Sequence, residues 1–280
     1  MDVGHLNQQP LLPVLLLFLT ANAMAQQTNA PTELVQAIQS GQMKVMDLTH
    51  TLSAQAPYWP EPNSLPSFRV RVTETYARDG YLGREVALPE HFGTHMDAPL
   101  HFDSKGKSVD QLSAKNFLAV AVVIDVTSAV RSNADYRLSI RDLERWVKAH
   151  GTMPRGCLVL LRTGWAARWP SEKHFMNQDA QGAMHFPGYS VGAARYLLEH
   201  VHPVGIGIDT SSIDYGLSKN FPVHHLTMTA GLYHLENLAN LDQLPLTGSC
   251  VIALPLKLQG GSGSPARVLA LVPEGPTAHN

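Results

Sequence analysis

Short aliphatic runs constrain the fold of this 280-residue chain more than any other feature. They occupy residues 117–126, 156–161, 204–208, 250–258 and 267–272. Runs of this length that are rich in Val, Ile and Leu are typical of strands buried on both faces. Two further stretches, 45–50 and 68–75, alternate between apolar and polar residues with period two and therefore predict half-buried strands.

Two helices are predicted between these runs. Ser139 is an N-cap candidate, and an apolar stripe over residues 143–147 stops at Gly151. Ser190 opens a second helix over residues 191–200. Strands outnumber helices and alternate with them irregularly, so the sequence predicts one α/β domain with a mixed sheet.

The N-terminus predicts a cleaved secretory signal. The apolar run over residues 11–21 is shorter than the about 20 residues that a membrane span needs, and Ala23-Met-Ala25 has the small-x-small pattern of a cleavage site. Residues 1–9 contain no Lys or Arg, which favours the alternatives of a disordered cytoplasmic extension or a misassigned start. The predicted parts are a signal peptide (1–25), a mature chain starting near Gln26 with an N-terminal segment (26–43), and a folded domain (44–280). A periplasmic or secreted location follows from this prediction.

Charge and cysteine content exclude several classes of protein. The net charge is −2, and Lys and Arg are scattered, which argues against nucleic acid or an anionic membrane surface as a partner. Cys157 and Cys250 each adjoin an aliphatic run, which predicts two buried thiols. A disulfide between them is permitted in an oxidising compartment, but two cysteines are too few to indicate a fold held together by disulfides. The glycine-rich stretch 260–265 is interpreted as a turn or an active-site loop rather than a linker.

One segment concentrates metal-binding residue types: His91-Phe-Gly-Thr-His95-Met-Asp97-Ala-Pro-Leu-His101. Imidazole and carboxylate without thiolate suit zinc or manganese, more often in catalytic than in structural sites. Residues 91, 95, 97 and 101 are separated by even numbers of positions, so their side chains point to the same face of an extended chain. Residues 91 to 97 would however span about 20 Å when extended, so we predict a bend at Gly93. The competing interpretation is that the histidines bind no metal. A pair of histidines four residues apart often occurs by chance, but the addition of Asp97 and of a third histidine, His101, makes this interpretation weaker.

A second cluster of histidines and acids lies in residues 222–238, which include His224, His225, His234 and Glu236. Alone, this cluster is more typical of a helix with solvated histidines than of a metal site. Together with the first segment it predicts a second ion, because a carboxylate that bridges two ions requires further nitrogen and oxygen ligands on the far side. Asp97 is the candidate bridge.

The pattern His-x-Gly-Thr-His-x-Asp-x-Pro-x-His at residues 91–101 resembles the hallmark of the cyclase family of metal-dependent hydrolases, which includes kynurenine formamidases and isatin hydrolases. The likeness continues in the family's order at 208–214, 224–236, 236–241, 253–257 and 263–267. It covers residues 44 to 272. The resemblance implies a swivelling β/β/α single domain, usually in homodimers or larger oligomers, with one or two Mn²⁺ or Zn²⁺ ions.

Residue roles are carried over from this resemblance alone. It implies that His91, His95 and Asp97 hold one ion, and that Asp97, His224 and Glu236 hold a second where a second is present. His101 matches the family's catalytic acid/base. The doubled His224-His225 leaves open which ring faces the metal, and the spacing of twelve residues to Glu236 favours His224. Tyr58 and Trp59 match an aromatic substrate-contacting loop, although Trp59 as core packing is the alternative.

The implied function is hydrolysis of an amide C–N bond, outside peptides, by metal-activated water. A cyclic amide such as isatin is favoured over N-formylkynurenine, because a secretory signal is out of place in cytoplasmic tryptophan breakdown. The alternatives are a lactone hydrolase and a non-catalytic metal-binding protein. His101 argues against the non-catalytic metal-binding protein, since a storage site needs no titratable group beyond its ligands.

Overall fold

The computed structural model describes residues 1, 29–59 and 68–274, so the predicted signal peptide (1–25), apart from Met1, and the cleavage site before Gln26 lie outside the described residues. The chain divides into two compact units, Met1–Gln42 and Met43–Asn280. The first unit contains α2 (Ala30–Gln39), a helix that the sequence analysis did not predict and that begins with a proline in its first turn. The division into segments 26–43 and 44–280 stays a prediction.

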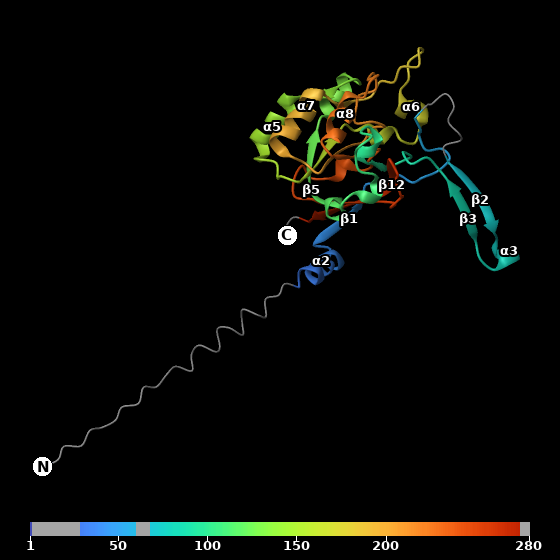
Figure 1. Cartoon of the computed structure of the whole chain (residues 1–280), viewed down its shortest axis with the longest axis horizontal. Helices are drawn as coiled ribbons and strands as arrows, with labels where there is room; N and C mark the ends of the chain where they lie inside the picture. Colours follow the sequence, from blue (N-terminus) through green and yellow to red (C-terminus); the bar gives the residue numbers. More distant parts are fainter. Residues whose placement is uncertain (2–28, 60–67, 275–280) are drawn as a thin grey trace, which may run out of the picture. The chain divides into compact units, whose positions relative to one another are not determined.

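A mixed eight-stranded sheet forms the centre of the second unit (Figure 1). The strand order is β1-β12-β11-β5-β7-β9-β10-β4, and β12 also pairs with β4, so the sheet closes on itself with β1 added at one side. Neighbours among β5, β7, β9 and β10 are parallel, and the other pairs are antiparallel. The predicted α/β class and mixed sheet are confirmed, whereas the closure was not predicted. The strands are β1 (Met43–Asp47), β4 (His95–Asp97), β5 (Leu118–Asp125), β7 (Leu158–Arg162), β9 (Gly205–Ile208), β10 (Tyr233–Glu236), β11 (Cys250–Pro255) and β12 (Gly263–Pro273).

Both predicted helices are present. In α5 (Ile140–His150), the Ser139 hydroxyl accepts from Asp142 N, and the Asp142 carboxylate accepts from Ser139 N in return. Such a capping box satisfies two amide groups that the first helical turn leaves without partners. The second helix, α7 (Val191–Tyr196), is shorter than predicted in its α-helical part and continues as the π-helical turn η6 (Leu197–Val201).

The remaining elements are short. The helices are α3 (Tyr76–Asp79), α4 (Thr127–Ser132), α6 (Glu172–Met176), α8 (Pro222–Thr229), η2 (Pro99–His101), η3 (Val109–Gln111), η4 (Ala114–Phe117), η5 (Trp165–Arg168) and η7 (Leu241–Gln243). The strands outside the central sheet are β2 (Arg69–Glu74), β3 (Gly83–Ala87), β6 (Arg137–Leu138) and β8 (Gly188–Tyr189). None of the helices in the described ranges has the length and apolar character that crossing a bilayer requires.

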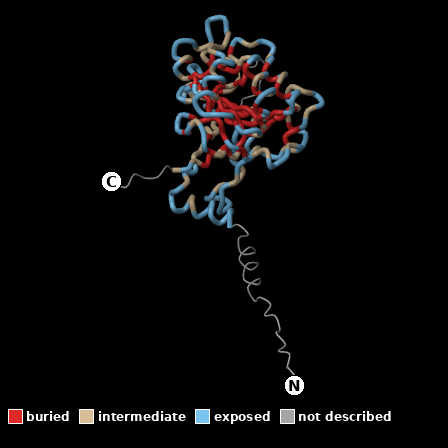
Figure 2. The backbone as a smooth tube through the Cα atoms, turned by 90° about the vertical axis from the view of Figure 1, so that its left-hand side faces the viewer, coloured by how far each residue is buried: buried red, intermediate tan, exposed pale blue. Residues whose placement is uncertain are grey.

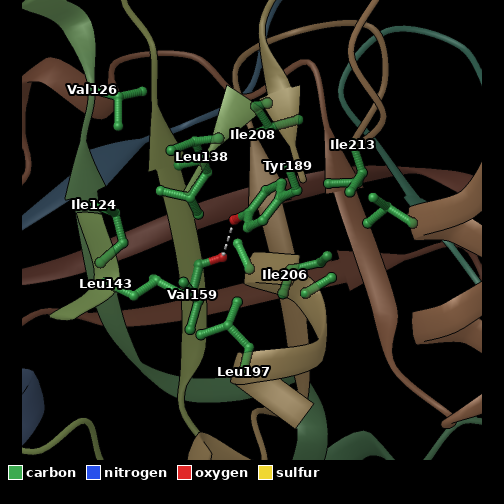
Figure 3. Packing of buried hydrophobic residues seen from close by; sticks show 14 of the residues in the cluster. Ile124, Val126, Leu138, Leu143, Val159, Tyr189, Leu197, Ile206, Ile208 and Ile213 are labelled. Atoms are coloured by element: carbon green, nitrogen blue, oxygen red, sulfur yellow. Dashed lines mark hydrogen bonds between the residues drawn. The ribbon is translucent and has the colours of Figure 1, made fainter. Parts of the chain in front are cut away.

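The strands β7 and β9 are buried on both faces, as their aliphatic runs predict. In the run 250–258 that prediction is wrong, because β11 ends at Pro255 and Leu254 and Leu256 are exposed. Val122 and Ile124 of β5 join one hydrophobic cluster, which also contains residues of α5 and α7, while Ala121 and Val123 join the other. Figure 3 shows the first cluster around Tyr189, whose hydroxyl donates to Val159 O at 3.1 Å. Figure 2 shows the buried residues gathered in the interior of the second unit, with exposed segments around them. The enclosed sheet therefore provides a rigid base for side chains at its strand ends.

Three predictions need correction or refinement. The strand at 68–75 exists as β2, but it pairs only with β3 in the described residues, and Val70 and Val72 are exposed rather than half-buried. Cys157 is buried, whereas Cys250 is only half-buried because it starts β11 at the end of the sheet; both are free thiols. The stretch 260–265 is a turn only in its first half, since β12 begins at Gly263.

Candidate metal centre

Strand register brings the two predicted clusters together. The short strand β4 lies between β10 and β12, and it places Asp97 opposite His234 and His95 opposite Glu236. Residues directly opposite each other on paired strands point to the same face. Four ligand-type side chains from distant parts of the sequence therefore share one face of the sheet. Gly263 lies opposite Asp97 on the other side, where a Cβ atom would approach His91 Cε1 to 2.5 Å.

The predicted bend at Gly93 is confirmed. Gly93 has φ +65°, a left-handed conformation that costs glycine little. The bend separates His91 from β4, and η2 then turns His101 back toward the same side. The His91 and His101 rings stack with their centroids 3.9 Å apart. All four polar residues of the first segment thus converge.

Asp97 lies at the centre of the cluster and is 1 % exposed. Its Oδ1 atom is 2.6 Å from His91 Nδ1 and 3.1 Å from His95 Nε2. Its Oδ2 atom faces the second cluster, 3.6 Å from His224 Nε2 and 3.7 Å from His234 Nδ1. The carboxylate thus has one oxygen directed at each predicted ion position.

Glu236 connects the two groups from the neighbouring strand. Its Oε1 atom is 3.2 Å from His224 Nε2, and its Oε2 atom is 3.5 Å from His95 Nε2. The backbone N–H of Ile213 donates to Oε1 at 2.8 Å, which helps to hold the buried carboxylate in place. His225, in contrast, is exposed and packs edge-on against Phe102, so the structure places His224 and not His225 in the cluster.

Outer hydrogen bonds orient three of the imidazoles. His95 Nδ1 lies 2.9 Å from Gly93 O, and His224 Nδ1 lies 2.8 Å from Asp214 Oδ2. His91 Nε2 is 2.9 Å from Ser262 Oγ, which donates its proton to Glu90. Because these partners can only accept from the rings, the inner nitrogens are left for the cluster. Metal-binding histidines almost always have this arrangement.

The donor set therefore fits a divalent cation. Asp97 Oδ2 and His234 Nδ1 are buried, and neither has a hydrogen-bond partner in the described part of the chain. A buried polar atom without a partner costs about 1–3 kcal/mol, which a cation between the two atoms would remove. Nitrogen and oxygen donors without thiolate suit zinc or manganese. The ligating atoms form two groups: Asp97, His224, His234 and Glu236; and His91, Asp97 and His101.

The carboxylates and imidazoles of the cluster shift one another's pKa values. Burial raises the pKa of Asp97, but charge on His91 and His95 and the nearby rings of His224 and His234 hold it well below its usual range. Burial lowers the pKa of His95, yet Asp97 and then Glu236 raise it to about 9. Burial also lowers the pKa of His224, but its hydrogen bond to Asp214 and the nearby carboxylates of Asp97 and Glu236 raise it well above its ordinary value. Protons therefore neutralise the carboxylates when no cation does, and metal binding releases them.

His101 differs from the other histidines of the segment. Its ring has no hydrogen bond within the described residues, and it lies at the wall of the adjoining cavity. Burial lowers the pKa of His101 to about 3 although the residue remains partly open, and the neighbouring histidines lower it further while Asp97 opposes them. The ring is therefore neutral near pH 7.

A cavity of about 270 Å³ opens onto the cluster. Aromatic residues Tyr58, Trp59, Phe102 and Phe221 line it, together with Ser211, Ser212 and Asn237. The two predicted substrate-contacting residues, Tyr58 and Trp59, are thus both at the cavity. Trp59 also packs against the first hydrophobic cluster, with its ring edge-on to Phe186, so the packing interpretation holds as well.

Several residues of the site were not assigned from the sequence. His234 was noted in the second cluster but given no role, although it lies two residues before Glu236 and so shares its face on a strand. Asp214 was noted only as part of the family likeness. Ser262 and Glu90 were missed, and their one signal was the interpretation of 260–265 as an active-site loop.

The closed mixed sheet and its His/Asp/Glu centre define a metal-dependent hydrolase. Residues 46–215 match the Cyclase family model. The chain is 34 % identical over 249 residues to isatin hydrolase of Roseibium aggregatum, covering 84 % of this chain and 94 % of the relative. It is 30 % identical over 223 residues to kynurenine formamidase of Geobacillus thermodenitrificans, covering 79 % and 94 %.

Solved structures agree with this assignment. Isatin hydrolase A from Labrenzia aggregata bound to benzyl benzoate superposes with a TM-score of 0.83 at 36 % identity, covering 88 % of this chain and all of that one. An isatin hydrolase bound to the product analogue thioisatinate gives a TM-score of 0.83 at 33 % identity, covering 88 % and 98 %. The chain belongs to the cyclase family of metal-dependent hydrolases, as its motifs predict.

Proposed function

We propose that this protein hydrolyses the C–N bond of an amide and that a cyclic aromatic amide such as isatin is the preferred substrate. The observation that carries the proposal is the direct opening of the His/Asp/Glu cluster onto an aromatic-walled cavity. Similarity to isatin hydrolases, one of them solved with a product analogue, supports isatin over N-formylkynurenine.

The predicted ligand roles belong to this proposal. His91, His95 and Asp97 would hold one Mn²⁺ or Zn²⁺ ion, and Asp97, His224 and Glu236 would hold a second. The donor types, the buried unpaired oxygen of Asp97 and the outer hydrogen bonds of the histidines support both sets. A divalent ion bound there lowers the pKa of water toward ~7 and polarises the carbonyl group of the substrate.

Proton transfer is assigned to His101. The neutral ring accepts a proton from the attacking water and donates it to the leaving nitrogen, which an amide needs in order to depart. Tyr58, Trp59 and Phe221 provide flat apolar surfaces against which an aromatic substrate can stack.

The proposal extends to location and assembly. A periplasmic or secreted enzyme is supported by the apolar run over residues 11–21 and the Ala23-Met-Ala25 pattern that follows it. A homodimer or larger oligomer is supported by the hairpin of β2 and β3, where Val70, Val72 and Val86 are exposed. An isolated hairpin is marginally stable in water, and exposed apolar patches mark interaction surfaces. Light scattering of the purified protein distinguishes a dimer from a monomer.

A turnover screen tests the substrate class. The Mn²⁺ and Zn²⁺ forms are assayed on isatin, N-formylkynurenine and simple lactones, and we expect the highest kcat/KM on isatin. Preference for lactones would replace amide hydrolysis by lactone hydrolysis. Absence of turnover on every substrate, with metal bound, would support the non-catalytic metal-binding alternative.

A further inference from the structure

The protonation state of His234 follows from its neighbours. His234 on β10 is fully buried, and its Nε2 atom is 2.7 Å from Thr227 Oγ1. The single hydroxyl proton of Thr227 is donated to Val223 O at 2.8 Å, since a carbonyl can only accept. Thr227 must then accept from the ring, so Nε2 bears a proton. In the neutral ring, which puts no charge at this fully buried position, Nδ1 then has a free lone pair.

That lone pair points toward another acceptor. His234 Nδ1 and Asp97 Oδ2 are 3.7 Å apart, and both atoms are buried without hydrogen-bond partners in the described ranges. Two acceptors that face each other in a buried site require a positive species between them. The outer bond of His234 to Thr227 also repeats the arrangement of His91, His95 and His224.

The spacing of the acceptors fits one small ion. Four nitrogen or oxygen ligands at 2.0–2.1 Å from a tetrahedral Zn²⁺ lie about 3.3–3.4 Å from one another. The separations here are 3.7 Å from Asp97 Oδ2 to His234 Nδ1, 3.6 Å from the same oxygen to His224 Nε2, and 3.2 Å from His224 Nε2 to Glu236 Oε1. These ligating atoms of all four residues lie within 4.8 Å of one another.

We propose that His234 is a fourth protein ligand of the second ion, and that Thr227 positions its ring. The proposal rests on the two-ion centre described under the proposed function. With Asp97, His224 and Glu236, it gives that ion a complete set of four protein ligands, which is the property of structural zinc sites. The second ion would then be retained as part of the fold, while the ion near His91 and His95 keeps a position open to the cavity.

Metal retention tests the proposal without reference to turnover. The full-length protein is loaded with Zn²⁺, dialysed against a chelator and analysed for metal by mass spectrometry. We expect the wild type to retain one ion per chain and His234→Asn to lose it. His225→Asn, which changes an exposed neighbouring histidine, is the matched control and should retain the ion. Equal retention in His234→Asn and the wild type, or no retained ion in the wild type, would overturn the proposal.

Thr227→Val provides a second test that leaves the imidazole and the packing volume in place. Loss of an orienting partner typically weakens metal binding 10- to 100-fold, so the retained ion should dissociate faster by this order. Thr229→Val, at an exposed position of the same helix, should match the wild type. Identical dissociation in both threonine variants would contradict the positioning role.

Failure of this inference can be distinguished from failure of the proposed function. A protein that hydrolyses none of the tested substrates but loses its retained ion in His234→Asn would refute amide hydrolysis and leave the ligand role intact. If the protein hydrolyses isatin while His234→Asn keeps its full metal content, amide hydrolysis would be supported and the ligand role of His234 would be refuted.

Discussion

Asp97 and His234 face each other across two neighbouring strands with Oδ2 and Nδ1 3.7 Å apart, and neither atom has a hydrogen-bond partner among the described residues. Because β4 and β10 fix this pair by backbone register, the four cluster residues on these strands, His95, Asp97, His234 and Glu236, are part of the sheet itself. The binding positions are therefore preorganised, and metal affinity should depend on individual side chains rather than on loop closure.

Asp97→Asn should abolish metal binding and activity together. The substitution keeps the shape of the side chain but removes the negative charge that faces both ion positions. Metal content after gel filtration is the direct measurement. A variant that purified with a full complement of metal would show that Asp97 is not a ligand.

His101→Ala should separate metal binding from chemistry. The ring is not held by an outer hydrogen bond in the described part of the chain, so its loss should leave the metal content unchanged. General acid/base catalysis by one side chain is worth about 10²- to 10⁴-fold, and kcat should fall by this order with little change in KM. Loss of metal would instead make His101 a ligand, and full activity would make it a bystander.

Ser262→Ala should weaken metal binding without removing a ligand. Ser262 accepts from His91 and donates to Glu90, so the alanine variant frees the His91 ring to rotate. A 10- to 100-fold rise in the metal dissociation constant is expected. Ser132→Ala, at an exposed position, is the control. Unchanged affinity in Ser262→Ala would show that its hydrogen bond does not position His91.

His50 should make stability depend on acid pH. Its ring stacks on Trp169 with centroids 4.1 Å apart, and burial lowers its pKa to about 4. The unfolded chain, with a pKa near ~6.5, binds more protons between these values. The contribution to stability is therefore complete above about pH 6.5 and is lost as the pH falls toward about 4.

His50→Phe tests this dependence because phenylalanine keeps the stacked ring and cannot be protonated. Urea unfolding at pH 7 and pH 4.5 should show a smaller loss of unfolding free energy in the variant than in the wild type. Identical losses in the two proteins would exclude His50 as a source of acid sensitivity.

The sequence was most informative where structure depends on near neighbours. The bend at Gly93 and the N-cap at Ser139 follow from residues a few positions apart, and both are present. The aliphatic runs predicted buried strands for the same reason. The pairing of β12 with β4 joins residues 263–265 to 95–97, and no local pattern encodes such a contact.

The same limit explains what was missed in the site. Even spacing from Glu236 places His234 on the correct face of a strand, but only the register of β10 against β4 sets it opposite Asp97. Period-two alternation likewise identified β2 without showing that nothing in the described residues but β3 pairs with it. The resemblance to a family assigned roles to His101, Tyr58 and Trp59 that residue chemistry alone left open.

The central claim is that the cluster hydrolyses an amide only when it holds a metal ion, and removal and return of the metal tests this most directly. The protein is stripped with a chelator, assayed on isatin, and assayed again after addition of Mn²⁺ or Zn²⁺. We predict no turnover in the stripped protein and recovery of activity in proportion to bound metal. Undiminished isatin hydrolysis by protein shown to be free of metal would contradict the account.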